Sequence, residues 1–251
     1  MRIFLCRDSI EGILSGVYDA WASRLGHGNV RLVLAGVGDM ELFAEYEEVM
    51  PDRGKADKVL RTLRRRLCLE DFEAVYRAVL SADQEKADSI YRFIVLALHS
   101  ERRILDNLEH PAIHHVFRMN RKTANEANRY LEFVRFRELY NGALFSEISP
   151  ESQVLPLIGE HFANRLPLEH FLIYDNRHKL CLVHAAGKPW VLAEADHIEE
   201  LEKIRLSEEE SEIEKSWQAF FDGIAIPERK NKALQQQFLP LKFRAYMTEK
   251  I

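Results

Sequence analysis

Arginine, lysine and asparagine recur at helical spacing in the middle of the chain, inside a segment predicted to be a helix over residues 113–133. Arg118, Lys122, Asn125 and Arg129 follow one another at intervals of four, three and four residues. This spacing places them on one face of a helix. Guanidinium, ammonium and amide groups donate hydrogen bonds to phosphate oxygens and base edges. The pattern is therefore typical of a phosphate-binding face, and an ordinary solvated helix face is the competing interpretation.

Further side chains that could bind phosphate follow along the chain. Arg135 and Arg137 alternate in a strand-like run that ends at Asn141-Gly142. His161 and Arg165 stand one helical turn apart, so they point the same way and could hold a phosphate together. His161 could instead be an acid–base group or a structural histidine. We predict one positive surface for a nucleic-acid backbone, formed by Arg118, Lys122, Arg129, Arg135, Arg137, His161 and Arg165.

No metal site and no cofactor is expected from the motifs. The ten histidines include no His-Glu-x-x-His or His-x-His pattern, and the three cysteines (Cys6, Cys68 and Cys181) are far apart. There is no phosphate-binding loop of the Gly-x-x-x-x-Gly-Lys type, and Gly36-Val37-Gly38 lacks the third glycine of a dinucleotide fingerprint. Residues 155–166 partly match a helix-hairpin-helix, but Leu157 stands where the first glycine of that motif is needed.

Composition favours a folded protein without a membrane span. The chain has 251 residues, 47% of them hydrophobic and 10% aromatic, which is ample for a core. No apolar run approaches 18 residues, and the first residues lack a signal-peptide core, so we expect a soluble cytoplasmic protein. The net charge is −5, but residues 194–214 hold ten acidic and two basic residues, which leaves the remainder at +3. One acidic segment thus accompanies a mildly basic body.

The order of predicted elements indicates an α+β fold. Strands are predicted at 2–6, 30–35, 170–175, 179–184 and 189–193, and helices at 57–69, 71–80, 84–99, 113–133, 152–166 and 232–238. We predict a small, mainly antiparallel sheet with surrounding helices. The whole chain, 1–251, is treated as one family domain. It has a helical section at about 55–133 and a sheet-containing section at about 134–195, against which a C-terminal helical segment, 207–248, packs.

Two local features lead to specific predictions. Asn141-Gly142 favours a two-residue type I′ turn, which would pair Tyr140 with Ala143 and Arg137 with Ser146 in a hairpin over 135–148. Near the C-terminus, a capping box at Ser207 and Glu210 should begin a helix. We expect the aromatic side chains of that helix to pack into the body of the protein; they are Trp217, Phe220 and Phe221.

Several short motifs occur in a defined order over nearly the whole chain, starting with the stretch from Asp8 to Trp21. They are Asn-Glu-Ala-Asn-Arg at 125–129, Arg-Phe-Arg-Glu at 135–138, Leu-Pro-Leu at 155–157, His-Phe-Ala-Asn-Arg at 161–165, Ile-Tyr-Asp-Asn-Arg at 173–177 and Glu-Arg at 228–229. In order and spacing, they resemble a bacterial family of unknown activity that is described as probable DNA metabolism proteins.

The resemblance implies a DNA-linked role and a protein partner. The family usually accompanies a radical-SAM protein thought to repair or modify DNA, and some relatives are fused to a uracil-DNA-glycosylase-like domain. Because cysteines are few, any iron–sulfur cluster would belong to the partner. The chain departs from the family at Asn128, where histidine is expected in many relatives. A catalytic role of that histidine would not carry over to this chain.

The leading hypothesis is an accessory nucleic-acid-binding protein that acts in DNA repair or modification with a radical-SAM partner. One alternative is a glycosylase-like enzyme for a damaged base or nucleotide, with His161 and Glu126 or Asp175 as candidate acid–base groups. Another is a protein-interaction scaffold that binds no nucleic acid. A further site is predicted from Glu126, Asp175, Arg177 and Arg229. Asp175 and Arg177 flank a predicted hairpin tip, where a local ion pair would also explain them.

Overall fold

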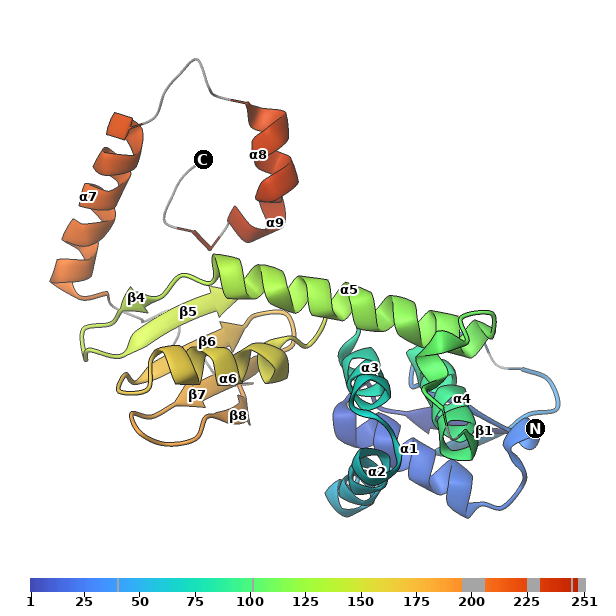
Figure 1. The fold of residues 1–251 in the computed structure, drawn as a ribbon. Coiled ribbons are helices and arrows are strands. Elements are labelled where there is room, and N and C mark those ends of the chain that lie inside the picture. Colours follow the sequence, from blue (N-terminus) through green and yellow to red (C-terminus); the bar gives the residue numbers. More distant parts are fainter. Residues whose placement is uncertain (40, 101, 196–205, 225–230, 245, 248–251) are drawn as a thin grey trace. The chain divides into compact units, whose positions relative to one another are not determined.

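The chain forms two compact units, residues 1–125 and 126–251 (Figure 1). The structure, a computed structural model, describes residues 1–39, 41–100, 102–195, 206–224, 231–244 and 246–247, except for the side chains of 221 and 222. Both units combine helices with a sheet, so the predicted α+β class is confirmed. The prediction that residues 1–251 act as one family domain stays a prediction.

The first unit is built on a parallel sheet of three strands. These are β1 (Arg2–Cys6), β2 (Val30–Leu34) and β3 (Glu45–Glu48), in the order β2-β1-β3. The helix α1 (Ile10–Ala22) connects β1 to β2, and the Ser9 hydroxyl caps it by accepting from the Gly12 amide at 2.9 Å. The first two strands agree with the sequence, whereas β3 was not predicted because its segment, Glu-Tyr-Glu-Glu, is polar.

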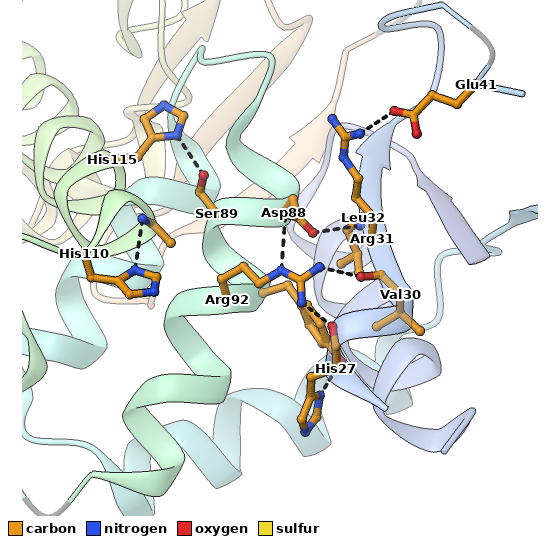
Figure 2. A network of polar contacts seen from close by, with 12 residues as sticks. His27, Val30, Arg31, Leu32, Glu41, Asp88, Ser89, Arg92, His110 and His115 are labelled. Atoms are coloured by element: carbon orange, nitrogen blue, oxygen red, sulfur yellow. Dashed lines mark hydrogen bonds and ion pairs between the residues drawn. The ribbon is translucent and has the colours of Figure 1, made fainter. Parts of the chain in front are cut away.

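Helices complete the first unit. They are α2 (Arg53–Arg66), α3 (Leu69–Leu80) and α4 (Lys86–His99), with short 3-10 turns η1 (His27–Asn29) and η2 (Ile104–Asp106). Figure 2 shows how α4 is tied to the sheet: the Arg92 guanidinium donates to the carbonyls of His27 and Val30, and Asp88 accepts from the Leu32 amide. These polar bonds fix the register of α4 against β2.

A long helix, α5 (Pro111–Phe133), begins in the first unit and ends in the second. Proline at its first position suits a helix start, because that residue needs no intrahelical amide bond. Ile113, Val116 and Met119 are buried in the core of the first unit, and Ala127 and Tyr130 are buried in that of the second. The face opposite these apolar residues carries the cations noted in the sequence.

The second unit holds a mixed sheet of five strands. They are β4 (Arg137–Glu138), β5 (Leu144–Ile148), β6 (Phe171–Asp175), β7 (Leu180–His184) and β8 (Val191–Glu194), paired in chain order. Only the β5–β6 pair is parallel, and α6 (Leu155–Arg165) makes that connection. Gly159 lets α6 approach the sheet, because a Cβ there would lie 2.7 Å from Leu182 and 2.9 Å from Trp190.

The predicted hairpin forms, but its turn is one residue longer than expected. Arg137 pairs with Phe145, not with Ser146. The Leu139 amide donates to the Ala143 carbonyl, and Gly142 has a positive φ of 78°. The loop is thus a three-residue turn closed by a left-handed glycine. Because one residue of slip exchanges the two faces of a strand, the predicted grouping of Arg137 with Ser146 is wrong.

The C-terminal segment contributes α7 (Glu208–Ile224), α8 (Lys232–Phe238) and α9 (Leu241–Arg244). The predicted cap is confirmed in part: Ser207 accepts from the Glu210 amide at 3.0 Å, but the Glu210 carboxylate accepts from the Glu138 amide. The expected burial of the aromatics is wrong for Trp217 and Phe220, which stay 44% and 55% exposed. Their rings contact each other along α7, with 5.8 Å between ring centres. The side chain of Phe221 and the segment 196–205 lie outside the described residues.

Candidate nucleic-acid interface

The α3–α4 connection and the segment 115–125 of α5 line an open cavity of about 320 Å³ in the first unit. Among the residues that line it are Asp83, His115, Arg118, Arg121, Lys122 and Asn125. Arg118, Lys122 and Asn125 come from the spacing seen in the sequence, and Arg121 lies beside them on α5. The structure therefore brings two of the seven predicted nucleic-acid-binding residues into one concave site.

The lining of this cavity is cationic and open to solvent. Arg118, Arg121, Lys122 and Asn125 are all exposed. The Arg121 guanidinium lies 5.7 Å from the centre of the Phe117 ring, a distance at which a cation is attracted to the ring face. Three cations and an amide are the donor types that hold phosphate oxygens. The cavity is thus chemically suited to an anion.

The cavity also contains a histidine with both ring nitrogens bonded. Nε2 of His115 lies 3.0 Å from Asp83 Oδ2. Its Nδ1 lies 2.8 Å from the Ser89 hydroxyl, a bond drawn in Figure 2. Ser89 is not among the residues that line the cavity. Through these two bonds, the imidazole joins α5 to α4 and to the segment before it.

Asp83 keeps its charge in this setting. Partial burial by itself would raise the pKa of Asp83, but hydrogen bonds from His115 and from the Glu85 amide outweigh burial and hold that pKa below its ordinary value. Neither Asp83 nor His115 was expected at this site from the sequence. His115 could have been found, because it precedes Arg118 by three residues and so lies on the same helical side.

Arg129 and Arg135 belong to the second unit, where their guanidinium groups contact a carboxylate and backbone carbonyls. The Arg129 guanidinium lies 3.2 Å from the Glu132 carboxylate and 3.3 Å from the Phe238 carbonyl. The Arg135 guanidinium donates to the carbonyls of Glu132 and Val134, at 2.9 and 3.2 Å. Both arginines are half-buried, and these bonds give them a structural role whether or not they also meet a ligand.

The remaining three predicted residues lie on the sheet and on α6. Arg137 is half-buried on β4, and His161 and Arg165 are exposed, one turn apart on α6. The His161 ring contacts Phe162 edge-on, with 5.2 Å between ring centres. Two of the seven residues therefore belong to the first unit and five to the second. The single positive surface stays a prediction.

Glu126, from the predicted further site, is buried and bonded to the backbone. Its side chain accepts from the amides of Glu151 and Ser152 at 2.8 and 2.9 Å, and Lys242 Nζ lies 3.4 Å away. This carboxylate holds the loop after β5 against α5. Burial raises the pKa of the Tyr130 hydroxyl, and the negative charges of Glu126 and Asp175 raise it further. Both carboxylates therefore influence the same buried phenol.

Asp175 is completely buried at the end of β6. It accepts from the amides of Arg177 and His178, and His178 Nδ1 lies 2.7 Å from its second oxygen. The histidine that contacts Asp175 is therefore His178 and not His161. Arg177 contributes its amide while its side chain is exposed, and Arg229 lies outside the described residues.

The described part of the chain contains no group of three or more histidine, cysteine, aspartate or glutamate residues that could hold a metal ion. Within the same residues, no helix has the length and apolarity needed to cross a membrane.

Comparison with known protein families identifies one family that matches the chain. A family model described as a domain of unknown function, DUF4130, matches residues 84–249, which is more than half of the sequence. The chain therefore belongs to the DUF4130 family, whose description names no activity. The match begins one residue after Asp83 and includes His115, the cations of the cavity and the whole sheet of the second unit. A search of curated proteins found no match.

Proposed function

We propose that this DUF4130 protein is an accessory nucleic-acid-binding protein in DNA repair or modification. The single observation that carries the proposal is the gathering of Arg118, Arg121 and Lys122 around one cavity of about 320 Å³. Such a cavity binds a backbone phosphate by charge and by hydrogen bonds. Phosphate contacts supply most of the affinity of proteins that bind nucleic acid without reading bases.

The chemistry of the side chains supports a phosphate rather than a carboxylate ligand. Two guanidinium forks offer paired donors that match the oxygens of a phosphate, and an ammonium adds a point charge. Asn125 adds an amide that can reach phosphate or sugar oxygens. The overall charge of −5 does not oppose this, because residues 194–214 carry a net charge of −8 and the rest of the chain carries +3.

The choice of DNA and of a partner rests on the family resemblance described above. The resemblance supports a radical-SAM protein as the partner that performs the reaction. In this proposal, the chain binds the nucleic acid and the partner modifies it. The cavity in the first unit then serves binding, and the two ring nitrogens of His115 join its walls through Asp83 and Ser89.

The test compares the salt dependence of binding between variants. Fluorescence anisotropy with a labelled 20-nucleotide DNA is measured at several NaCl concentrations for wild type and for Arg118→Ala/Arg121→Ala. Removing two phosphate contacts should lower the slope of log affinity against log salt by about 1.4 for a single strand or about 1.8 for a duplex. The matched control is Arg24→Ala/Lys188→Ala, which removes two exposed cations that do not line the cavity.

The two double variants decide the proposal together. The control should keep most of the wild-type slope, and both variants should melt within a few degrees of wild type. An Arg118/Arg121 variant that is folded and keeps the wild-type affinity and slope would show that the cavity does not hold a phosphate. If the wild-type protein binds no strand at low salt, the interaction-scaffold hypothesis replaces this one.

A separate observation favours a second function, that of an enzyme for a damaged base or nucleotide. The completely buried Asp175 lies 2.7 Å from Nδ1 of His178, and the His178 side chain is 20% exposed. A buried carboxylate on Nδ1 orients an imidazole so that Nε2 can accept a proton. The test incubates the protein alone with a uracil-containing oligonucleotide. Turnover that is lost in His178→Ala and in Asp175→Asn would establish the enzyme, and binding without turnover favours the accessory role.

A further inference from the structure

A second cavity in the first unit has a different character. It measures about 380 Å³ and lies among α1, α2 and α4, and its walls are mostly apolar. Tyr18, Trp21, Lys58, Thr62, Leu63 and Ile94 are among its lining residues. Two aromatic rings, one cation and one threonine therefore line an otherwise aliphatic space, with no carboxylate in the lining.

The Trp21 indole is held in place from the protein side while it remains 40% exposed. Its ring centre lies 4.6 Å from that of His27 and 6.4 Å from that of His99. The His27 ring is fixed in turn, because its Nδ1 lies 2.7 Å from the Tyr91 hydroxyl. An indole that is supported in this way loses little conformational entropy when a second ring stacks on it.

The helix beside this cavity is strongly basic. Along α2, Lys58, Arg61 and Arg65 recur at intervals of three and four residues and are all exposed. Asp57 is the only acidic residue of this helix. Lys58 belongs to the lining itself, and its ammonium lies 5.5 Å from the centre of the Tyr18 ring. A ligand with a flat apolar body and an attached anion would meet complementary groups.

We infer that this cavity binds an unpaired nucleobase, with the adjoining phosphates on the cations of α2. The inference rests on the proposed function and adds to it a preference for single-stranded nucleic acid. Bases stack on aromatic side chains regardless of sequence, and cations beside such rings follow the backbone. A volume of about 380 Å³ has room for one ring system. A paired base would have to leave its stack to enter, so a duplex should bind more weakly.

The test separates base contacts from phosphate contacts. Anisotropy is measured with a labelled 15-nucleotide deoxythymidine strand and with a strand of equal length that carries tetrahydrofuran abasic sites in place of the bases. Wild type should bind the base-bearing strand on the order of tenfold more tightly, since stacking of one base on an aromatic side chain is worth this much. Trp21→Ala should remove the difference and leave binding of the abasic strand unchanged.

Two further variants complete the experiment. Ala22→Leu adds bulk at an exposed lining position without adding a ring, and it should also remove the difference. Trp217→Ala removes an equally exposed tryptophan on α7 and should change nothing.

The outcomes distinguish this inference from the proposed function. Equal binding of the two strands by wild type, or a difference that survives in Trp21→Ala and Ala22→Leu, overturns the base-binding inference alone. Absence of binding to either strand overturns the proposed function as well. If the dye 8-anilinonaphthalene-1-sulfonate binds in a Trp21-dependent manner and no strand displaces it, the cavity belongs to another apolar ligand, and the inference is wrong.

Discussion

Nε2 of His115 lies 3.0 Å from Oδ2 of Asp83, and this bond places a carboxylate in the same cavity as three cations. The arrangement keeps the cavity from being a uniformly basic patch. Asp83 pairs with the first turns of α5 through His115, and it reduces the net positive charge that a bound phosphate would meet.

Replacing Asp83 with asparagine should therefore tighten binding of an oligonucleotide. The amide keeps an acceptor for His115, but the negative charge beside the phosphate is gone. A unit charge at about 4 Å in a water-like medium is worth about 1 kcal/mol, which corresponds to about fivefold in affinity. Anisotropy at fixed salt measures this. The control, Glu209→Gln, removes an exposed acid from α7 and should have a smaller effect. Unchanged or weaker binding by Asp83→Asn would count against a phosphate in the cavity.

The Arg129→Ala/Arg135→Ala variant should lose both stability and binding. The loss of one ion pair and of bonds to three carbonyls should lower the free energy of unfolding by about 1–2 kcal/mol, as measured by urea denaturation. If both arginines also contact phosphates, the salt slope should fall by about 2 in total. A variant that loses stability but keeps its oligonucleotide affinity and slope would assign these arginines to the fold alone.

His27 should make stability depend on pH. Burial, together with His99 and Arg92, lowers the pKa of His27 in the folded protein. As pH falls through about 6.5, the unfolded chain takes up a proton at this residue before the folded chain does, so stability is lost. We expect the melting temperature of wild type to fall more steeply between about pH 7.5 and pH 5 than that of His27→Asn. Parallel curves for the two proteins would contradict this assignment.

The three cysteines should differ sharply in reactivity. Cys6 and Cys181 are buried, and burial raises the pKa of each thiol to about 12, so about one in ten thousand is a thiolate at pH 8. Cys68 is exposed. Ellman's reagent should modify one thiol quickly in the folded protein and the other two only after denaturation. Cys68→Ser should abolish the fast phase, and a fast phase of two or more thiols would show that the core is open.

Local sequence determined most of the elements of this protein. The apolar runs of β1, β2, β6 and β7, the stripe of α5 and the Ser9 cap all depend on neighbours within a few residues. Helical periodicity alone also gathered Arg118, Lys122 and Asn125, because residues three and four apart share a face wherever the helix lies. These features could be predicted since they need no knowledge of distant contacts.

The register of the hairpin could not be predicted from the turn residues alone. Asn-Gly fits a two-residue turn, yet the structure uses a three-residue loop, with Gly142 as its left-handed residue. The choice agrees with packing on both sides of β5. Phe145 is buried with Tyr174 and Cys181, while Ile148 faces the core beneath α6. The turn residues permit either loop, and burial of the strand decides between them.

The two cavities depend on tertiary structure for the same reason. Asp83 reaches His115 across 32 residues of sequence, and Trp21 lines a cavity with Ile94, which is 73 residues away. No periodicity connects such positions. These residues come together because α4 packs on its neighbours in one arrangement. That packing rests on many weak contacts, and each of them depends on the shape of the whole core. The sequence by itself determined which faces are cationic and which are apolar. The packing of the helices decided which of those faces enclose a site.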